Sequence, residues 1–297
     1  MTTADTDERI PIKARRVRFD WQETPLHWVA DDPQTTHTIN VLHLLLPAGE
    51  KWFVELYRQV LPQVTDAGLR EDVKGFIGQE ATHSRAHAAV LDHLATQNVA
   101  TTRYTRRIEW LFDRLLADRP IGLRLPRPLR REWTRHRLAL IAAIEHFTAA
   151  LGAWLLDAEQ LDRPDNDPVM MDMLRWHAAE EVEHRSVAFE LSEHLGGGYF
   201  RRLVGMLEVV PALLYLWIVG VAFLMKGDPT GPGRPRVRSY LRASLRAGRL
   251  PGPGALARMV PRYLRPGYHP LQEASTAKAQ AYLARSPAAT AARSGAV

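Results

Sequence analysis

Long stretches of this chain repeat their apolar residues with the spacing of an α-helix, and this pattern constrains the fold more than any other feature. Between residues 66 and 96, for example, Leu69, Val73 and Phe76 begin an apolar stripe that continues to Leu94. Alternating runs of Val, Ile and Thr, which are typical of half-buried strands, do not recur. The sequence therefore predicts an all-α protein.

Proline, glycine and charge divide the chain into four parts. The first 35 residues are polar and contain three prolines, which predicts an irregular N-terminal arm over residues 1–35. A helical bundle is predicted over residues 36–198, ending at a run of glycines. An apolar helix is expected over residues 199–226, and a basic helical tail with a mobile end over residues 227–297.

The predicted bundle contains five helical segments. An aspartate suited to cap a helix N-terminus precedes the second and the fifth segment, and a proline follows the aspartate of the fifth. Pro47 is expected to kink the first segment or to start a new turn in it. The segments are residues 36–60, 66–96, 102–117, 129–161 and 167–195.

Composition narrows the possible chemistry. Hydrophobic residues make up 46% of the chain and charged residues 24%, which excludes a wholly disordered or multi-span membrane protein. The absence of cysteine excludes disulfides, thiolate catalysis and cysteine-ligated metal sites. Any metal must therefore be held by histidine and carboxylate, a donor set that suits iron, manganese or zinc. No secretory signal opens the sequence, so we expect a cytoplasmic location.

Two short motifs place the candidate chemistry. Among twelve histidines, only His83 and His184 have an acidic residue three positions earlier, Glu80 and Glu181. A spacing of three residues puts both side chains of each pair on one helix face. Each pair can therefore offer a carboxylate and an imidazole to the same metal ion.

Two further glutamates complete the pattern. Glu50 lies on the helical segment before Glu80, and Glu145 lies among apolar residues on the segment before Glu181. A buried, unpaired carboxylate costs several kcal/mol, so each requires a cation or a proton. Four glutamates and two histidines on four helices form the di-metal set of ferritin-like bundles. We therefore expect a ferritin-like four-helix bundle with additional helices and a basic C-terminal extension.

Two more histidines share these helix faces. His177 precedes Glu181 by four residues, so this helix could present a third metal ligand. His87 follows His83 by four residues and could be a further ligand or a hydrogen-bonding neighbour of one. Three residues that point about 100° away from the ligand stripe are expected to pack or to face solvent: His146, Glu180 and Glu183.

Several strings resemble known families. They are PAGEKWF at 47–53, FIGQEATHSRAH at 76–87, IEHFTA at 144–149 and WHAAEEVEHRSVAFE at 176–190. Over residues 36–195 they resemble the bacterial family catalogued as predicted metal-dependent hydrolases. The ligand order is also similar to that of the di-iron arylamine N-oxygenases of the 4-aminobenzoate N-oxygenase type. That resemblance implies seven metal ligands here: Glu50, Glu80, His83, Glu145, His177, Glu181 and His184.

The resemblance to the oxygenases leads to our first functional expectation. We expect a non-haem di-iron oxygenase or oxidase that uses dioxygen on a small amine or lipophilic substrate. Two iron ions are the expected cofactors, and no nicotinamide or flavin fingerprint is present, so an electron-donor protein is a candidate partner. The alternative is a hydrolase with manganese or zinc, in which the metals activate water. The third hypothesis is a non-catalytic protein that binds metal or associates with a membrane.

An apolar segment and a basic tail raise the question of a membrane. Residues 203–225 contain one charge, Glu208, and are long enough to span a bilayer, although Glu208 and Pro211 interrupt them. We expect a helix that is packed on the bundle or placed against a membrane. Residues 226–297 carry 13 lysines and arginines against two acids, which suits the inner, anionic face of a membrane. Nucleic acid is a less favoured partner because interleaved aromatic residues are missing.

Overall fold

A computed structural model describes residues 11–231 and 237–295 of the chain. The described residues form helices and no β-strand, which confirms the all-α prediction. The α-helices are α1 (Pro33–Val60), α2 (Ala67–Thr96), α3 (Thr102–Trp110), α4 (Arg127–Leu156), α5 (Pro168–His184), α6 (Val187–His194), α7 (Tyr199–Gly227), α8 (Val237–Arg246), α9 (Pro253–Tyr263), α10 (Thr276–Arg285) and α11 (Pro287–Ser294).

The predicted N-caps are present. Asp66 accepts a hydrogen bond from the backbone N–H of Leu69 at 2.7 Å, and Asp167 accepts one from Met170 at 2.7 Å. Each satisfies one of the backbone donors that the first turn of a helix leaves without an intrahelical partner. Pro47 lies inside α1, which continues through it without a break.

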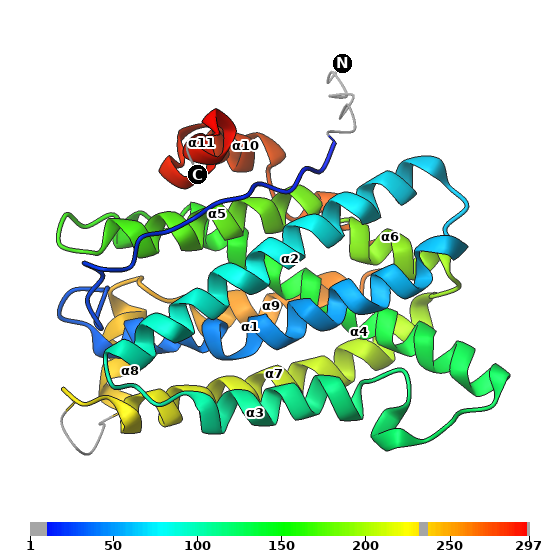
Figure 1. Cartoon of the computed structure of the whole chain (residues 1–297), viewed down its shortest axis with the longest axis horizontal. Helices are drawn as coiled ribbons and strands as arrows, with labels where there is room; N and C mark the ends of the chain where they lie inside the picture. The colour runs from blue at the N-terminus through cyan, green and yellow to red at the C-terminus, as the bar shows by residue number, and fades with distance from the viewer. Residues whose placement is uncertain (1–10, 232–236, 296–297) are drawn as a thin grey trace.

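Four long helices form the centre of the molecule. α1 packs mainly against α2, α4 packs mainly against α5, and α2 also contacts α5 (Figure 1). Gly152 permits the close approach of α4 to α5, because a Cβ at this position would lie 2.9 Å from the carbonyl oxygen of Ala178. Fully buried aromatic side chains, among them Tyr57, Phe76 and Trp176, fill the space between the helices.

The predicted fifth helix is interrupted. A turn at Arg185 and Ser186 separates α5 from α6, where the sequence pattern predicts one continuous helix to residue 195. The Arg185 guanidinium is buried and donates hydrogen bonds to the carbonyl of Val182 and to the hydroxyl of Thr276. The break thus coincides with a contact to a distant segment that helical periodicity does not reveal.

The remaining helices lie outside this centre. α7 packs on α1 and α4, α3 packs on α1, α9 packs on α4, and α10 and α11 pack on α5. The segment before α1 has no regular secondary structure. It crosses α2 and α5 in an extended conformation (Figure 1). Arg15 of this segment contacts buried carboxylates of α5, as described below.

The division into four parts stays a prediction. The described portion of the arm is irregular up to Asp32, and α8, α9 and α10 lie in the tail that was expected to be helical. The end of the tail, which we expected to be mobile, contains the helix α11. Parts of the arm and tail predictions fall on residues 1–10, 232–236 and 296–297, which lie outside the described residues.

Candidate metal centre

Eight side chains predicted from the sequence meet between four helices. We call them the Glu/His cluster, and none is more than 5% exposed. α1 contributes one, α2 three, α4 one and α5 three: Glu50, Glu80, His83, His87, Glu145, His177, Glu181 and His184. The structure thus brings together every residue that the sequence singled out for metal binding.

Two carboxylates occupy the middle of the cluster. An oxygen of Glu80 lies 3.6 Å from Nδ1 of His83 and 3.3 Å from Nε2 of His184. Oxygens of Glu181 lie 3.4 Å and 3.5 Å from the same two nitrogens. Each carboxylate therefore stands between the two imidazoles, as a bridging ligand would.

The other side chains divide between the two ends of the cluster. Glu50 and His177 lie with His83, because the candidate ligand atoms of these groups fall within 4.8 Å of one another in overlapping triads. Glu145 lies at the other end, with its Oε2 3.2 Å from Nε2 of His184. The arrangement offers two adjacent positions for metal ions that share the central carboxylates.

Many ligand-type atoms in the cluster have no hydrogen-bond partner. These buried atoms are both carboxylate oxygens of Glu50 and of Glu80, Nδ1 of His83, Oε2 of Glu145, Oε2 of Glu181 and Nε2 of His184. Buried polar atoms are nearly always paired, and leaving one unpaired costs about 1–3 kcal/mol, more when it is charged. Metal ions would satisfy these atoms together, so the residues present fit a di-metal group.

Burial and neighbouring charges shift the pKa values of several side chains in the Glu/His cluster. Burial and the charge of Glu80 raise the pKa of Glu50 well above its usual value, and burial with the charge of Glu181 raises that of Glu145 to about 8. Burial lowers the pKa of His184, but the charge of Glu181 and contacts with nearby carboxylates outweigh it and raise this pKa well above normal. Glutamates and histidines of the cluster therefore hold protons that metal ions would displace.

The two ligand histidines are oriented by residues of the opposite motif. Nε2 of His83 donates to Glu180 at 2.9 Å, and Glu180 immediately precedes Glu181 in the chain. Nδ1 of His184 donates to the side-chain oxygen of Gln79 at 2.9 Å, and Gln79 immediately precedes the motif of α2. Each bond fixes which ring nitrogen is free for a metal: Nδ1 in His83 and Nε2 in His184.

Arg15 joins these two hydrogen bonds into one network. Its guanidinium donates to Glu180 at 2.7 Å and to both oxygens of Glu183 at 2.8 and 3.0 Å. Gln79 also donates to Glu183, at 2.6 Å. A continuous path of hydrogen bonds therefore runs from His83 through the arginine of the N-terminal arm to His184.

Two glycines of α2 allow the N-terminal arm to pass close to this helix. A Cβ at Gly75 would lie 2.3 Å from the carbonyl oxygen of Ile12, and one at Gly78 would lie 2.9 Å from Cβ of Ala14. Only a helix surface without side chains at these two positions allows the arm to pass so closely. The glycines thus place Arg15 above the buried carboxylates.

Three histidines form a second hydrogen-bonded chain. His177 lies 2.8 Å from Glu181 through Nε2 and 2.6 Å from Nε2 of His87 through Nδ1. His87 in turn contacts His43 of α1, with 2.7 Å between their Nδ1 atoms. Both ring nitrogens of His87 are therefore engaged by neighbouring histidines, an arrangement that favours a positioning role for this residue.

Sequence reasoning missed the residues around the ligands. Glu180 and Glu183 were expected to pack or to face solvent, but both are buried and ion-paired to Arg15. The sequence did show two acids, Glu180 and Glu183, beside the candidate ligands of α5. It did not show that α2 and the N-terminal arm cover that side of the helix. His146 packs outside the cluster, with its ring nitrogens 2.8 Å from the hydroxyl of Tyr268 and 3.0 Å from the carbonyl of Met259.

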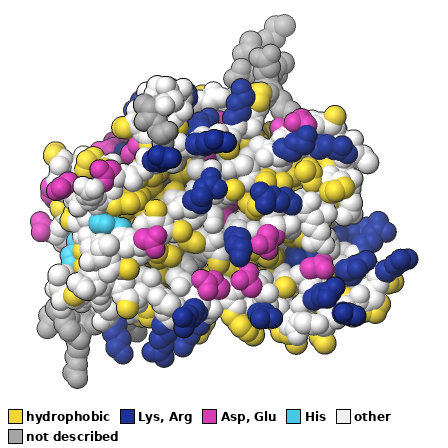
Figure 2. Space-filling model, in the orientation of Figure 1, with side chains coloured by type: hydrophobic (Ala, Val, Ile, Leu, Met, Phe, Trp, Pro, Cys, Tyr) yellow, Lys and Arg dark blue, Asp and Glu magenta, His cyan; other side chains and the backbone are white. Residues whose placement is uncertain are grey.

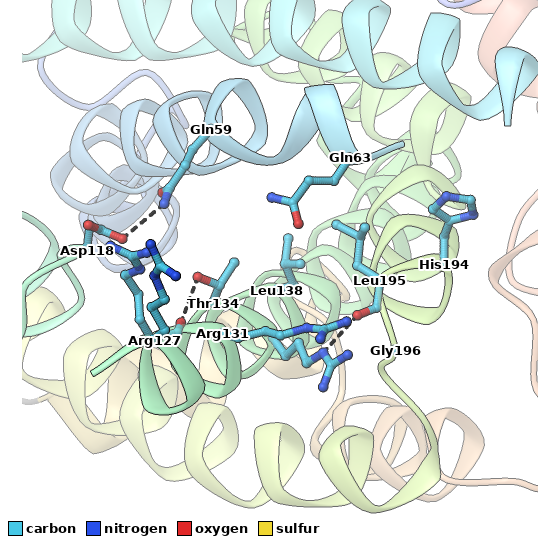
Figure 3. A pocket seen from close by; sticks show the side chains of 12 residues that line it. Gln59, Gln63, Asp118, Arg127, Arg131, Thr134, Leu138, His194, Leu195 and Gly196 are labelled. Atoms are coloured by element: carbon cyan, nitrogen blue, oxygen red, sulfur yellow. Dashed lines mark hydrogen bonds between the residues drawn. The ribbon is translucent and has the colours of Figure 1, made fainter. Parts of the chain in front are cut away.

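A separate cleft of about 620 Å³ opens near one end of the bundle. Gln59, Asp118, Arg127, Arg131 and His194 are among its lining residues (Figure 3). None of the eight residues of the Glu/His cluster lines it, nor the second cleft of about 360 Å³ beside α10. Both clefts are therefore distinct from the cluster, whose side chains are buried.

Another group of metal-type side chains joins the arm, α1 and the end of α7. His27 and His37 lie 2.6 and 2.9 Å from the same oxygen of Asp228. These hydrogen bonds account for the arrangement without a metal ion. Burial, despite the nearby Asp228, lowers the pKa of His37, which keeps its ring neutral.

Comparison with known proteins gives one family. A family model described as predicted metal-dependent hydrolase matches residues 13–274, which is most of the chain. Searches of curated proteins and of solved structures gave no match. The matched range includes Arg15 and all eight residues of the Glu/His cluster.

The match overturns our first functional expectation. From the ligand order we expected a di-iron oxygenase or oxidase, and the family model instead describes a hydrolase. The error has a chemical reason, because glutamate and imidazole ligands suit metals that activate water as well as metals that react with oxygen. Ligand type and order therefore did not decide between the two reactions.

Proposed function

Because the chain belongs to the family of predicted metal-dependent hydrolases, we propose that it is a hydrolase whose reaction takes place at the Glu/His cluster. The observation that carries this proposal is the set of buried, unpaired ligand atoms. Nδ1 of His83, Nε2 of His184 and both oxygens of Glu80 lack hydrogen bonds although they lie together in the core. A cluster of this kind has no evident structural purpose without bound cations.

Each ligand has a position in the proposed centre. Glu80 and Glu181 would hold the metal ions together with His83 and His184, since each carboxylate lies between these two imidazoles. Glu50 would bind at the His83 end. The other ligands of the proposed set are Glu145, at the His184 end, and His177, beside His83. When bound, two divalent metal ions would lower the pKa of a coordinated water and supply the nucleophile for hydrolysis.

The surrounding residues would hold the ligands in productive positions. Glu180 and Gln79 keep the protons of His83 and His184 on the nitrogens that face away from the centre. His87 would orient His177 rather than coordinate a metal itself, because both of its ring nitrogens contact other histidines, whereas Nε2 of His177 faces the carboxylate of Glu181 in the middle of the cluster.

The test is hydrolysis with isotopic water in the absence of oxygen. The full chain would be loaded in separate samples with ferrous iron, manganese or zinc, and supplied under nitrogen with activated carboxylic, phosphate and amide esters in ¹⁸O-labelled water. The proposal expects turnover with one ¹⁸O atom entering the product from water, and loss of turnover in Glu181→Gln. Matched Glu159→Gln, which alters an exposed glutamate, should retain it. Absence of metal binding by the folded chain, or turnover that survives Glu181→Gln, would refute the proposal.

A further inference from the structure

α7 presents an apolar face that no described part of the chain covers. Two helices, α4 and α7, are long and apolar enough to cross a membrane; 61% of the apolar window of α4 is buried, but only 22% of that of α7. The exposed side chains of α7 include Phe200, Leu207, Leu214 and Ile218, at 60–74% exposure. Intervals of seven, seven and four residues place these four side chains on one stripe of the helix.

The opposite face of α7 is built for tight packing. A Cβ at Gly205 would lie 3.0 Å from the carbonyl oxygen of Ala139 in α4, and one at Gly220 would lie 3.0 Å from Val41 in α1. Met206 and Leu224 are fully buried on this side. α7 is therefore fixed to the bundle along one face, and its outer apolar stripe is held toward the surroundings.

A basic and apolar segment lies beside α7. Tyr104 of α3 donates to the carbonyl of Leu216 at 2.6 Å, so α3 and α7 run side by side along one edge of the molecule (Figure 1). From residue 102 to residue 131 the chain has nine arginines and three acids. Figure 2 shows many lysine and arginine side chains at the end of this edge, among hydrophobic ones.

Large apolar side chains are exposed between these arginines. Trp110, Leu115, Ile121, Leu123 and Leu129 are each 41–60% exposed. Ile121 also has a left-handed backbone, with φ 47°, which is costly for a β-branched residue. Arginine with exposed tryptophan, leucine and isoleucine is the composition of segments that lie in the interface of an anionic membrane.

We infer that the outer face of α7 and the segment 102–131 dock on an anionic lipid surface. Acyl chains would cover the apolar stripe, and lipid phosphates would pair with the arginines. Arg119, Arg124 and Arg127 are available for this, since their side chains are exposed. A second copy of this chain is a poorer occupant, because a symmetric contact through this face would bring two strongly basic segments together.

Vesicle flotation of the full chain tests the inference. We expect binding to vesicles of phosphatidylcholine with 30% phosphatidylglycerol, at least tenfold weaker binding to pure phosphatidylcholine, and a decline as salt is raised. The double variant Leu214→Glu with Ile218→Glu should bind the anionic vesicles at least tenfold more weakly. Leu271→Glu, which changes an exposed leucine in a distant segment, is the matched control and should bind as the unaltered chain does.

A second set of variants separates charge from apolar contact. Replacing Arg119, Arg124 and Arg127 by glutamine should remove most of the preference for anionic vesicles, because each arginine near the surface contributes about fivefold in affinity. Sedimentation of the same proteins without lipid measures self-association. Failure to bind anionic vesicles, or a dimer that the Leu214 and Ile218 substitutions dissociate, would overturn the inference.

Discussion

Glu180 accepts a hydrogen bond from Nε2 of His83 at 2.9 Å, and both side chains are completely buried. The bond leaves Nδ1 of His83 directed at the central carboxylates. A buried carboxylate that receives an imidazole N–H orients the ring and increases the basicity of its other nitrogen. The relation between these two residues thus determines how one end of the Glu/His cluster can bind a metal.

We expect Glu180→Gln to weaken metal binding by about 10- to 100-fold, the usual effect of losing such a hydrogen-bonded partner. An amide can still accept the hydrogen bond, but it carries no charge to make His83 a stronger donor to the metal. Competition with a chelator measures the affinity. Glu159→Gln is the control on an exposed glutamate. Equal affinities in the two variants would contradict this role of Glu180.

The raised pKa values predict opposite pH responses with and without metal. Glu145 has a pKa of about 8 because of burial and the charge of Glu181, and that of Glu50 is also raised. A group whose pKa is raised by folding stabilises the fold at low pH, and this contribution is lost as the pH rises through the raised pKa. The metal-free chain should therefore melt at a lower temperature at pH 9 than at pH 7.

Metal binding should show the reverse trend. Ions must displace the protons held by the cluster, so the apparent affinity should increase from pH 6 to pH 8, with protons released on binding. Calorimetry in buffers of different ionisation enthalpy counts these protons. Metal binding without proton release at pH 7 would show that the carboxylates are already ionised, which would contradict the raised pKa values.

Loss of Arg15 should destabilise the fold and the metal centre together. Arg15→Met leaves Glu180 and Glu183 buried without their guanidinium partner. Breaking a well-buried ion pair from one side costs about 3–5 kcal/mol, and the partial exposure of Arg15 reduces this to about 2 kcal/mol. For a chain of 297 residues we expect a melting temperature lower by roughly 3 °C.

The neighbouring Arg16 is exposed and supplies the control, Arg16→Met, which should melt within about 1 °C of the unaltered chain. Adding Glu183→Gln to Arg15→Met should recover part of the loss, since one buried charge is then removed. If Arg15→Met melts as Arg16→Met does, the arm does not stabilise the cluster.

Gly75→Ala should displace the arm although alanine favours the helix. Alanine in a helix interior is favoured over glycine by about 1 kcal/mol. The added Cβ would lie 2.3 Å from the carbonyl oxygen of Ile12, so α2 and the arm could not both keep their positions. We expect faster proteolysis within residues 11–20 and weaker metal binding, as in Arg15→Met. Retention of both properties would show that the arm can shift without releasing Arg15.

The sequence predicted what depends on local spacing. Asp66 and Asp167 were correct as N-caps, and spacing along single helices selected six of the eight side chains that the structure brings together, the exceptions being Glu50 and Glu145. These properties follow from the geometry of single helices, which the order of residues determines. Whether the eight bind metal stays a prediction.

Contacts between distant segments were beyond sequence reasoning. Arg15 lies in a segment without periodicity, so nothing in the sequence assigned it to Glu183, 168 residues away. The turn at Arg185 coincides with a contact to Thr276, and the exposure of α7 depends on which of its faces meets the bundle. Each of these contacts is decided by how complete helices pack. A single sequence shows only which side chains each helix carries.

The hydrogen bonds between α2 and α5 are reciprocal. Gln79 of α2 orients His184 of α5, and Glu180 of α5 orients His83 of α2. Neither imidazole is therefore held in its final direction by its own helix. The orientation of both histidines is reached only when α2 and α5 have docked, so it is a property of the assembled bundle.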